Sequence, residues 1–419
     1  MTHLSIYYIA RSRIPSERAE ILTTLHTSDA LAGKGCEVDI FLSSLKVTFE
    51  PSLNEFNKLG VSGYYGVRRK IPIHRVPVFQ RHLKLFPYSK RGLIGWRIAD
   101  LSFDPIAVLY VAIYMLSHGR PDALIIRGLP TTFTFLLFKH IIGVPIIYEA
   151  HHILNFQHDV NFRAKVREIF VLKNADGIIA VTENIKKLMV KMGIPQHKIC
   201  IASTGASIEM FGVPMKKQAV RKQLMLPANC PIILYVGALY SYKGADILLR
   251  AFKKVREQVA DAKLLIAGGL RKEEDASYIG KLIDDFKLRE SVILTGYVPF
   301  YKVPFYIGSA DIAVFAPPRT FYTEYCGESL KVWQYMAARK PIIASRLKSL
   351  EESLTHEVNA LLVAPSDVNE LSNTMIRLIK DQALAEALAD RAFNDFKANY
   401  SWEKRGERII EFIHRLLRR

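Results

Sequence analysis

A strand, a glycine turn and a lysine follow one another just past the middle of the chain. Residues 235–244 read Y-V-G-A-L-Y-S-Y-K-G, and a predicted helix, 245–255, comes next. Glycine at Gly237 lets the backbone approach a ligand closely, and the amino end of the helix favours an anion. Lys243 is therefore a candidate contact for a diphosphate. The alternative is a solvated lysine at an ordinary strand-to-helix turn. The spacing is not that of a P-loop, which disfavours a P-loop ATPase.

A second polar loop, E-Y-C-G-E-S-L-K at 324–331, precedes a short predicted helix. Ser329 suits the N-cap position, so the backbone amides that follow it, beginning with Leu330, are candidates to receive phosphate oxygens. Lys331 and Gln334 are three residues apart and share one helix face. They would offer a cation and a hydrogen-bonding amide to the same ligand. An ordinary capped helix is the alternative interpretation.

Strand-forming apolar runs alternate with longer amphipathic segments along the chain. Because parallel strands need crossover helices, this alternation predicts an α/β fold with doubly wound parallel sheets. The predicted strands are 5–10, 37–42, 123–126, 145–148 and 177–181 in the first half, and 232–236, 263–267, 292–294, 312–315 and 341–344 in the second.

The length of 419 residues is typical of two domains. The strand–helix rhythm breaks in a polar stretch over 211–230, which predicts a first domain over 1–213 and a second over 214–401. The last segment, 402–419, is a basic amphipathic helix. We expect it to pack on the nearest core, and packing back onto the first domain is one option.

The formal net charge of +18 suggests an anionic partner. The candidates are nucleic acid, a membrane surface and an acidic or phosphorylated substrate. The four cysteines show no C-x-x-C spacing, which disfavours a disulfide framework or a zinc site and favours a reducing, cytoplasmic environment. Residues 1–10 are typical of a first strand rather than a signal peptide. The longest apolar run, 106–116, is too short to span a bilayer.

Taken together, the two polar loops resemble the donor site of glycosyltransferase family 4. That family carries G-x-L-x-x-x-K-G after the first strand of its C-terminal domain and E-Y-M-A-x-G-x-P further on. Similar motifs follow in the family's order along almost the whole chain, including P-D-A-L-I-I-R at 121–127, Y-E-A-H at 148–151, L-T-G-Y-V-P at 294–299 and N-A-L-L-V-A-P at 359–365. Each motif is weak alone, but their order and spacing are specific. The resemblance implies the GT-B fold, in which two Rossmann-like domains face each other across a cleft.

The resemblance also implies a retaining transfer from a nucleotide-sugar co-substrate, UDP-, GDP- or dTDP-linked, without another cofactor and without a metal. On the donor side, Lys243 looks like the family lysine that contacts the donor phosphates. Gln334 occupies the place of the glutamate that holds the ribose. Gly296, Tyr297 and Val298 resemble the stretch that lies against the nucleobase.

The donor motifs depart from the family pattern at several positions. Ala238 stands where an arginine is common, and Gln334 replaces the second glutamate of the E-x7-E motif. The position of the first glutamate is Cys326, and Glu328 is the nearest substitute. We expect Lys331 to offset the missing arginine.

On the acceptor side, His151 resembles a family histidine that faces the acceptor and the sugar, and we count it among the catalytic candidates with Lys243 and Glu328. Arg11 and Arg13, after the first strand, are candidates to meet an anionic acceptor; for each of them a solvated surface position is the alternative. The stretch Arg68–Arg97 is basic with interleaved aromatic residues and contains no acidic residue. It suits an anionic membrane surface or a lipid diphosphate. No nucleic-acid-binding module accompanies it, so we do not expect nucleic acid as a partner.

The leading hypothesis is an enzyme that transfers a sugar to a lipid-linked or polysaccharide acceptor, located in the cytoplasm and peripherally on the inner face of the cytoplasmic membrane. One alternative is a non-catalytic GT-B protein that binds a nucleotide sugar or a partner, since several charged positions are altered. Another alternative is a GT-B epimerase, which would need no acceptor.

Overall fold

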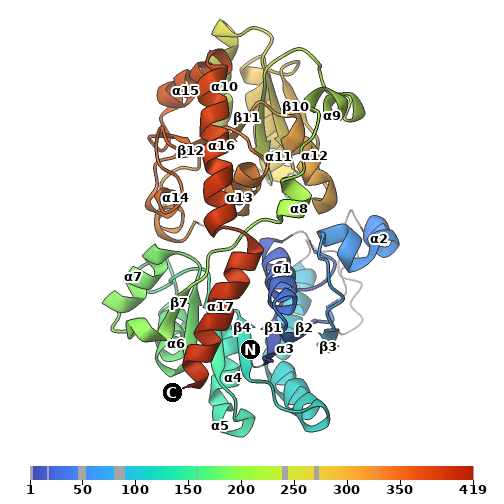
Figure 1. Cartoon of the computed structure of the whole chain (residues 1–419), viewed down its shortest axis with the longest axis vertical. Coiled ribbons are helices and arrows are strands. Elements are labelled where there is room, and N and C mark those ends of the chain that lie inside the picture. Colours follow the sequence, from blue (N-terminus) through green and yellow to red (C-terminus); the bar gives the residue numbers. More distant parts are fainter. Residues whose placement is uncertain are drawn as a thin grey trace. The chain divides into compact units, whose positions relative to one another are not determined.

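The structure is a computed structural model in which the chain forms two compact units (Figure 1). It describes residues 3–16, 18–45, 53–79, 90–157, 159–237, 244–268, 273–327 and 329–418, with the backbone alone for 90–101 and 273–276. The first unit comprises Met1–Ser203 and Trp402–Arg419, and the second comprises Thr204–Ser401. Each unit contains one parallel sheet, so the predicted α/β class is confirmed.

The sheet of the first unit has the strand order β3-β2-β1-β4-β5-β6-β7, and every pair of neighbours is parallel. Its central strands are almost continuous buried apolar runs, as expected for a parallel sheet covered on both faces. The strands are β1 (Ser5–Ala10), β2 (Glu37–Ser43), β3 (Ile73–Val76), β4 (Ala123–Arg127), β5 (Ile146–Ala150), β6 (Gly177–Ala180) and β7 (Ile199–Ile201).

Helices cover both faces of this sheet because its connections run in opposite directions from β1. The crossover from β1 to β2 moves one way across the sheet, whereas those from β3 to β4, β4 to β5 and β5 to β6 move the other way. Right-handed crossovers therefore place α1 on one face and α3, α4 and α6 on the opposite face. The helices of this unit are α1 (Ala19–Gly33), α2 (Leu53–Tyr65), α3 (Lys90–His118), α4 (Leu129–Leu137), α5 (Lys139–Ile142), α6 (Phe162–Asn174), α7 (Glu183–Lys191) and α17 (Trp402–Leu417), with a 3-10 turn at Gln196–Lys198.

The second unit repeats this architecture with the strand order β10-β9-β8-β11-β12-β13. Its strands are β8 (Ile232–Val236), β9 (Lys263–Ala267), β10 (Val292–Leu294), β11 (Ile312–Phe315), β12 (Ile342–Ser345) and β13 (Leu361–Val363). Its helices are α8 (Ile208–Phe211), α9 (Lys217–Gln223), α10 (Ala245–Gln258), α11 (Glu273–Asp285), α12 (Val303–Ser309), α13 (Leu330–Ala337), α14 (Lys348–Glu351), α15 (Val368–Lys380) and α16 (Gln382–Asn399), with a 3-10 turn at Phe300–Lys302 and a π-helical turn at Tyr322–Cys326.

The units divide between Ser203 and Thr204, earlier than the boundary predicted near residue 214. The reason is that α8 packs on α13 of the second unit. The chain leaves the second unit after Tyr400, whose ring stacks on Trp333 at 4.2 Å. Two residues later, Trp402 stacks on His26 of the first unit at 5.3 Å.

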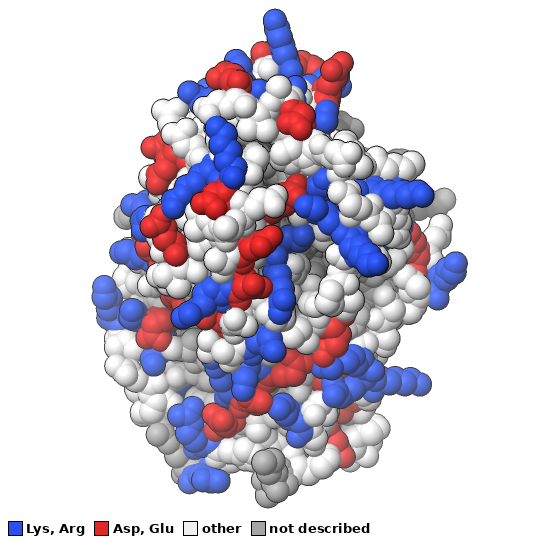
Figure 2. Space-filling model, turned by 45° about the horizontal axis from the view of Figure 1, so that its top comes forward, with Lys and Arg blue, Asp and Glu red and all other residues white. Residues whose placement is uncertain are grey.

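Charged side chains of both signs are interspersed on the face of the molecule that Figure 2 presents. Ion pairs also surround α17. Lys34, directly after α1, donates to Glu407 at 2.7 Å, and Arg68 donates to Glu403 at 2.5 Å. Part of the basic excess near Arg68 thus serves to hold α17 within the first unit.

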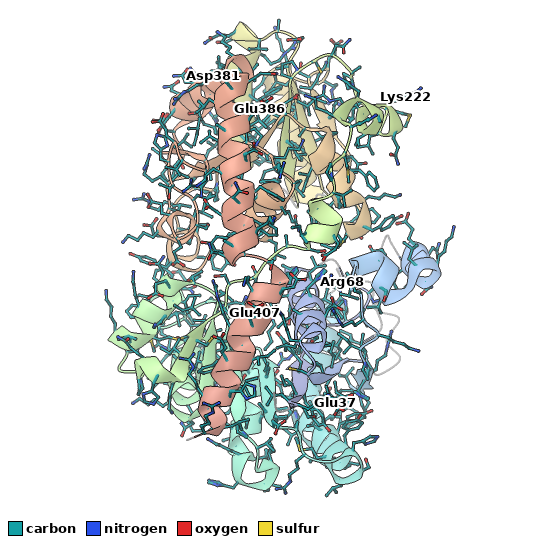
Figure 3. All side chains as sticks on the ribbon, viewed as in Figure 1. Glu37, Arg68, Lys222, Asp381, Glu386 and Glu407 are labelled. Atoms are coloured by element: carbon teal, nitrogen blue, oxygen red, sulfur yellow. The ribbon has the colours of Figure 1, made fainter. Side chains whose placement is uncertain are left out.

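Helix α17 packs closely on α1, and Figure 3 labels Arg68 and Glu407 at this contact. A side-chain carbon added to Gly406 would lie 3.2 Å from backbone and side-chain carbons of Ala30, so the glycine allows the helices to approach. At the far end of α17, the Phe412 ring fills the space over Gly177, where an added carbon would lie 2.7 Å from the ring. The final helix therefore completes the core of the first unit.

Candidate functional site

Three glycines follow three neighbouring strands of the second sheet. Gly237 comes directly after β8, Gly268 after β9, and Gly296 shortly after β10. A side-chain carbon on Gly268 would lie 2.3 Å from the carbonyl oxygen of Gly237, and Gly268 also pairs with Gly296 through an isolated bridge. Gly237 has a φ of 107°, which residues with a side chain disfavour. This carboxyl edge of the sheet is therefore lined by backbone without side chains, which a ligand can approach closely.

The side chain of Lys331 lies against this edge. A carbon added to Gly237 would lie 2.6 Å from Cε of Lys331. The Nζ atom lies 4.9 Å from the ring centre of Phe315 and 5.4 Å from that of Tyr235, two aromatic residues at the ends of β11 and β8. The structure thus brings together Gly237 and Lys331, two predicted donor contacts that are far apart in the sequence.

Lys331 lies in the first turn of helix α13. Ser329 is the N-cap residue and has extended backbone angles, as its sequence position predicts, but its side chain makes no capping hydrogen bond. Leu330 and Lys331 are the first two residues of the helix. Because the first amides of a helix have no intrahelical partner, this end of α13 presents partial positive charge next to the Lys331 cation.

Two neighbouring residues anchor α13 to the sheet. The Tyr335 hydroxyl accepts a hydrogen bond from the backbone amide of Val236 at 3.0 Å, and burial raises the pKa of Tyr335 above its ordinary range. Gln334, the predicted ribose contact, is buried on the same helix. The sequence analysis did not single out Tyr335. Its neighbours in the motif are mostly apolar, so the sequence did not indicate that its hydroxyl makes a hydrogen bond.

The predicted nucleobase contacts lie further along the glycine edge. Gly296 has a φ of 67° and follows β10, the edge strand on that side of the sheet. Tyr297 and Val298 come next and are half-buried. Since β8 and β10 are separated by β9, the Gly237 and Gly296 positions are two strand spacings apart, about 10 Å.

Lys243, Glu328 and Ala238 lie outside the described residues. Beyond Lys243, Gly244 is the N-cap of α10 with a left-handed φ of 79°. A carbon added to it would lie 3.0 Å from the carbonyl oxygen of Ala316, so a side chain there is disfavoured twice. The glycines at both ends of the first predicted loop are therefore required by the backbone.

In the first unit, a buried carboxylate organises the predicted catalytic histidine. Glu149 of β5 accepts from Nε2 of His151 at 2.5 Å and from the hydroxyl of Tyr8. The guanidinium of Arg405, on α17, lies 3.1 Å from the same carboxylate, and both side chains are fully buried. Arg405 also donates to Thr27 at 2.8 Å and to the carbonyl oxygen of Ala202.

These contacts decide the protonation states in the cluster. Burial alone would raise the pKa of Glu149, but Arg405, His151 and Arg127 outweigh burial and hold that pKa well below its ordinary range. Burial and the charge of Arg127 outweigh the opposing effect of Glu149 and lower the pKa of His151 to about 4. His151 is therefore neutral near pH 7. Because the ionised Glu149 can only accept, the neutral ring carries its proton on Nε2, and Nδ1 is an acceptor.

The two arginines after β1 are not fully exposed to solvent. Arg11 forms an ion pair with Asp104, which is itself buried and accepts from Thr131 at 2.7 Å. Arg13 is half-buried. The Arg11 guanidinium is thus engaged in an ion pair within the first unit. Among the residues that the structure describes, no group of three or more histidine, cysteine or acidic side chains is arranged to hold a metal ion.

Arg405 and Glu149 are the main residues of this buried cluster that the sequence analysis missed. Glu149 could have been predicted, because it stands in the Y-E-A-H motif two residues before His151. Arg405 gave no such signal, because it lies in an amphipathic helix whose arginines are otherwise surface residues.

Two family models match the chain and together cover most of it. Residues 22–205 match the glycosyl transferase 4-like domain, and residues 216–395 match the glycosyl transferases group 1. Among curated proteins, an uncharacterized glycosyltransferase of Methanocaldococcus jannaschii is 24% identical over 90% of this chain and 89% of its own length. The D-inositol 3-phosphate glycosyltransferase of Corynebacterium urealyticum is 25% identical over 93% of this chain and 89% of its own length.

A solved structure shares the arrangement of elements. The Anabaena protein HepE, in complex with UDP and glucose, superposes with a TM-score of 0.74 at 17% sequence identity, covering 99% of this chain and all of that one. At this identity the likeness concerns the fold. It agrees with the pair of Rossmann-like sheets described above.

Proposed function

This chain belongs to the glycosyltransferases of the GT-B, family 4 type, an assignment from which we propose that it takes a sugar from a nucleotide-sugar donor bound by its second unit. It is an enzyme that transfers sugars. We propose its donor class, the stereochemical course of the transfer and its acceptor.

The observation that carries the donor proposal is the position of Lys331. Its ammonium group lies over the ends of β8 and β11, against the bare backbone of Gly237 and beside the amino end of α13. A cation and a helix amino terminus match the charge of a diphosphate, and the glycine edge lets the backbone approach it closely. HepE, with the same fold, is described in complex with UDP and glucose.

We propose that Lys331 and Lys243 neutralise the diphosphate as the bond to the sugar breaks. Negative charge develops on the leaving oxygen, and preorganised donors stabilise it more than they stabilise the bound ground state. Gln334 would hold the ribose, Gly296, Tyr297 and Val298 would border the base, and Glu328 would face the sugar. The proposed transfer is retaining and uses no covalent nucleophile.

His151 is proposed to face the sugar and the acceptor. Because Glu149 fixes the proton on Nε2, the Nδ1 atom offers a lone pair to a hydroxyl group. Such a contact orients a substrate hydroxyl without adding a positive charge beside the donor. This role requires the neutral state, which the lowered pKa of His151 provides.

For the acceptor, we propose a lipid-linked or polysaccharide chain at the cytoplasmic face of the membrane. The net charge of +18 and the basic stretch Arg68–Arg97 support an anionic partner. Within the described part of that stretch, however, Arg68 and Arg69 both lie beside Asp29, and Arg68 also pairs with Glu403. Arg11 and Arg13 remain candidates for acceptor contact by resemblance.

The donor proposal is tested by ligand-induced thermal stabilisation with UDP-, GDP- and dTDP-sugars. Lys331→Ala should weaken binding of the preferred donor by about tenfold to a hundredfold, because hydrogen bonds to charged groups contribute about 1.5–3 kcal/mol. Lys254→Ala, which removes an exposed lysine from α10, is the matched control and should leave affinity unchanged. Equal donor affinity in wild type and Lys331→Ala would refute the proposed site.

A further inference from the structure

Two helices on one face of the first sheet expose stripes of large apolar side chains. On α3, Leu109, Ile113 and Leu116 are exposed, and Leu116 reaches 88%. On α6, Phe162, Val166 and Ile169 are exposed, and Phe162 reaches 78%. Within each stripe the residues are four and then three positions apart, so they share one side of their helix. A surface helix normally turns this pattern toward the core, and here it is turned outward.

Helix α4 and the short α5 connect the two stripes. Helix α4 contacts both α3 and α6, and the rings of Phe133 and Phe170 join α4 to α6 at 5.1 Å. Between and beyond the stripes, Leu137 and Ile141 are exposed as well. The guanidinium of Arg120, after α3, would lie 3.0 Å from a carbon added to Gly143, after α5. The exposed residues of α3, α4, α5 and α6 therefore form one surface, which we call the apolar helix face.

The charges on the apolar helix face are of one sign. Arg120, Arg163 and Lys173 are exposed at the ends of its helices or along them. Among the described side chains of α3, α4, α5 and α6, the only acidic ones are Asp104 and Glu168, and both are buried. The face of the molecule shown in Figure 2 differs, because acidic and basic side chains are mixed there.

We propose that the apolar helix face docks on a membrane surface that carries anionic lipid. Apolar side chains enter the boundary between head groups and acyl chains, while the surrounding basic residues meet lipid phosphates. The contact is peripheral: no helix of the described chain is both long and apolar enough to cross a membrane. A symmetric contact with a second copy is disfavoured, since it would bring the same basic residues together without acidic partners.

The residues that carry this surface follow the Arg68–Arg97 stretch in the sequence, and the docking deepens the proposed function by placing the enzyme at the source of a lipid-linked acceptor. The docking itself rests on the exposed residues alone. Vesicle binding and donor binding are separate measurements, so failure of one proposal leaves the other standing.

The experiment is flotation of the full chain with vesicles of phosphatidylcholine alone and of phosphatidylcholine with phosphatidylglycerol in equal parts. Wild type should float with the mixed vesicles. Leu116→Glu with Ile141→Glu should lower the bound fraction by more than about tenfold, since each lost apolar side chain accounts for roughly a tenfold change in partition. Met225→Glu, at an apolar residue of the second unit that is 92% exposed, is the matched control and should float like wild type.

Thermal unfolding and donor-induced stabilisation should be the same in all three proteins, because every replaced side chain is exposed. The proposal is overturned if the wild-type protein floats with neither kind of vesicle. It is also overturned if the double variant floats like the wild type. Sedimentation of wild type as a dimer that the double variant alone dissociates, with flotation unchanged, would assign the face to a second copy and overturn the lipid assignment.

Discussion

At the scale of single residues, the most consequential contact joins Arg405 to Glu149. Both side chains are fully buried, 3.1 Å apart, and the same carboxylate holds His151. A buried ion pair is costly to break, because removing one partner leaves the other charge without compensation. The catalytic candidate in the first unit therefore depends on a residue from the end of the chain.

Arg405→Met should lower the free energy of unfolding by about 3–5 kcal/mol, because the Glu149 carboxylate would remain buried without its main partner. Lys404→Met, one residue earlier, removes a half-exposed pair with Glu407 and should cost less than about 1 kcal/mol. Urea denaturation measures both. Adding Glu149→Gln to Arg405→Met should recover part of the loss. A cost for Arg405→Met no larger than that for Lys404→Met would contradict the buried pair.

The pH dependence of stability should report the state of His151. Its pKa is lowered from 6.5 to about 4 in the folded protein, so protons bind preferentially to the unfolded chain over this window. Stability is then fully present above pH 6.5 and is lost as the pH falls toward 4, at up to about 1.4 kcal/mol per pH unit. His151→Gln should have a shallower slope there. His152, whose pKa is also lowered, is present in both proteins and cancels. Parallel curves would show that His151 titrates normally.

At the scale of elements, the proposed donor site is built by one short helix and one sheet edge. Helix α13 supplies its amino end and Lys331, and Tyr335 fastens it to Val236 at the end of β8. The sheet edge supplies the backbone at Gly237 and Gly268, which lie so close together that Gly268 has no room for a side chain. The site therefore depends on how closely two strand ends and a helix approach.

Gly268→Ala should disturb this edge. The added carbon would lie 2.3 Å from the Gly237 carbonyl oxygen, so we expect a loss of stability of about 1–3 kcal/mol and a weakened thermal shift with the donor. Gly280→Ala in α11 is the matched control. Nothing lies within 4 Å of its added carbon, and helix propensity predicts a gain of about 0.4–1 kcal/mol. Denaturation and donor titration of both variants distinguish local crowding from a general effect of alanine.

At the scale of the whole molecule, the two units differ in how many segments of the chain form them. The second is a single continuous segment, Thr204–Ser401, whereas the first needs both Met1–Ser203 and the terminal helix. Helix α17 brings Arg405 to Glu149 and covers α1 with a buried face that includes Trp402, Ile409 and Phe412. The units should therefore differ in their ability to fold alone.

A fragment of residues 204–401 should unfold cooperatively and be stabilised by the nucleotide sugar that stabilises the full chain. A fragment of residues 1–203 should be unstable or insoluble, because the Glu149 carboxylate and one face of α1 lose their partners. Fusing residues 402–419 to residue 203 through a flexible linker should restore folding. Circular dichroism and thermal unfolding of the three fragments are the measurement; a stable 1–203 fragment would contradict the structural role of α17.

The sequence by itself determined the class of fold and most of its strands. Every strand predicted from an apolar run is present, because central parallel strands are buried on both faces and show as continuous apolar segments. Strands β3, β7 and β13 were not predicted. They are edge strands of three or four residues, and pairing on one side alone leaves a weak sequence signal; among the edge strands, β10 alone was predicted, from its apolar run at 292–294. The family and the candidates Gly237, Lys331 and His151 were likewise readable, since motif order and spacing lie along the chain.

Only the tertiary structure decided which of these residues meet. Lys331 lies against Gly237 because β8 and β11 are neighbours in the sheet, although β9 and β10 separate them in the chain. Arg405 reaches Glu149 because α17 returns to the first unit, and its charge is balanced by a partner that periodicity cannot identify. The outward stripes of α3 and α6 follow the same rule. A helical pattern shows that one side is apolar, but the packing of the whole unit decides whether that side is covered.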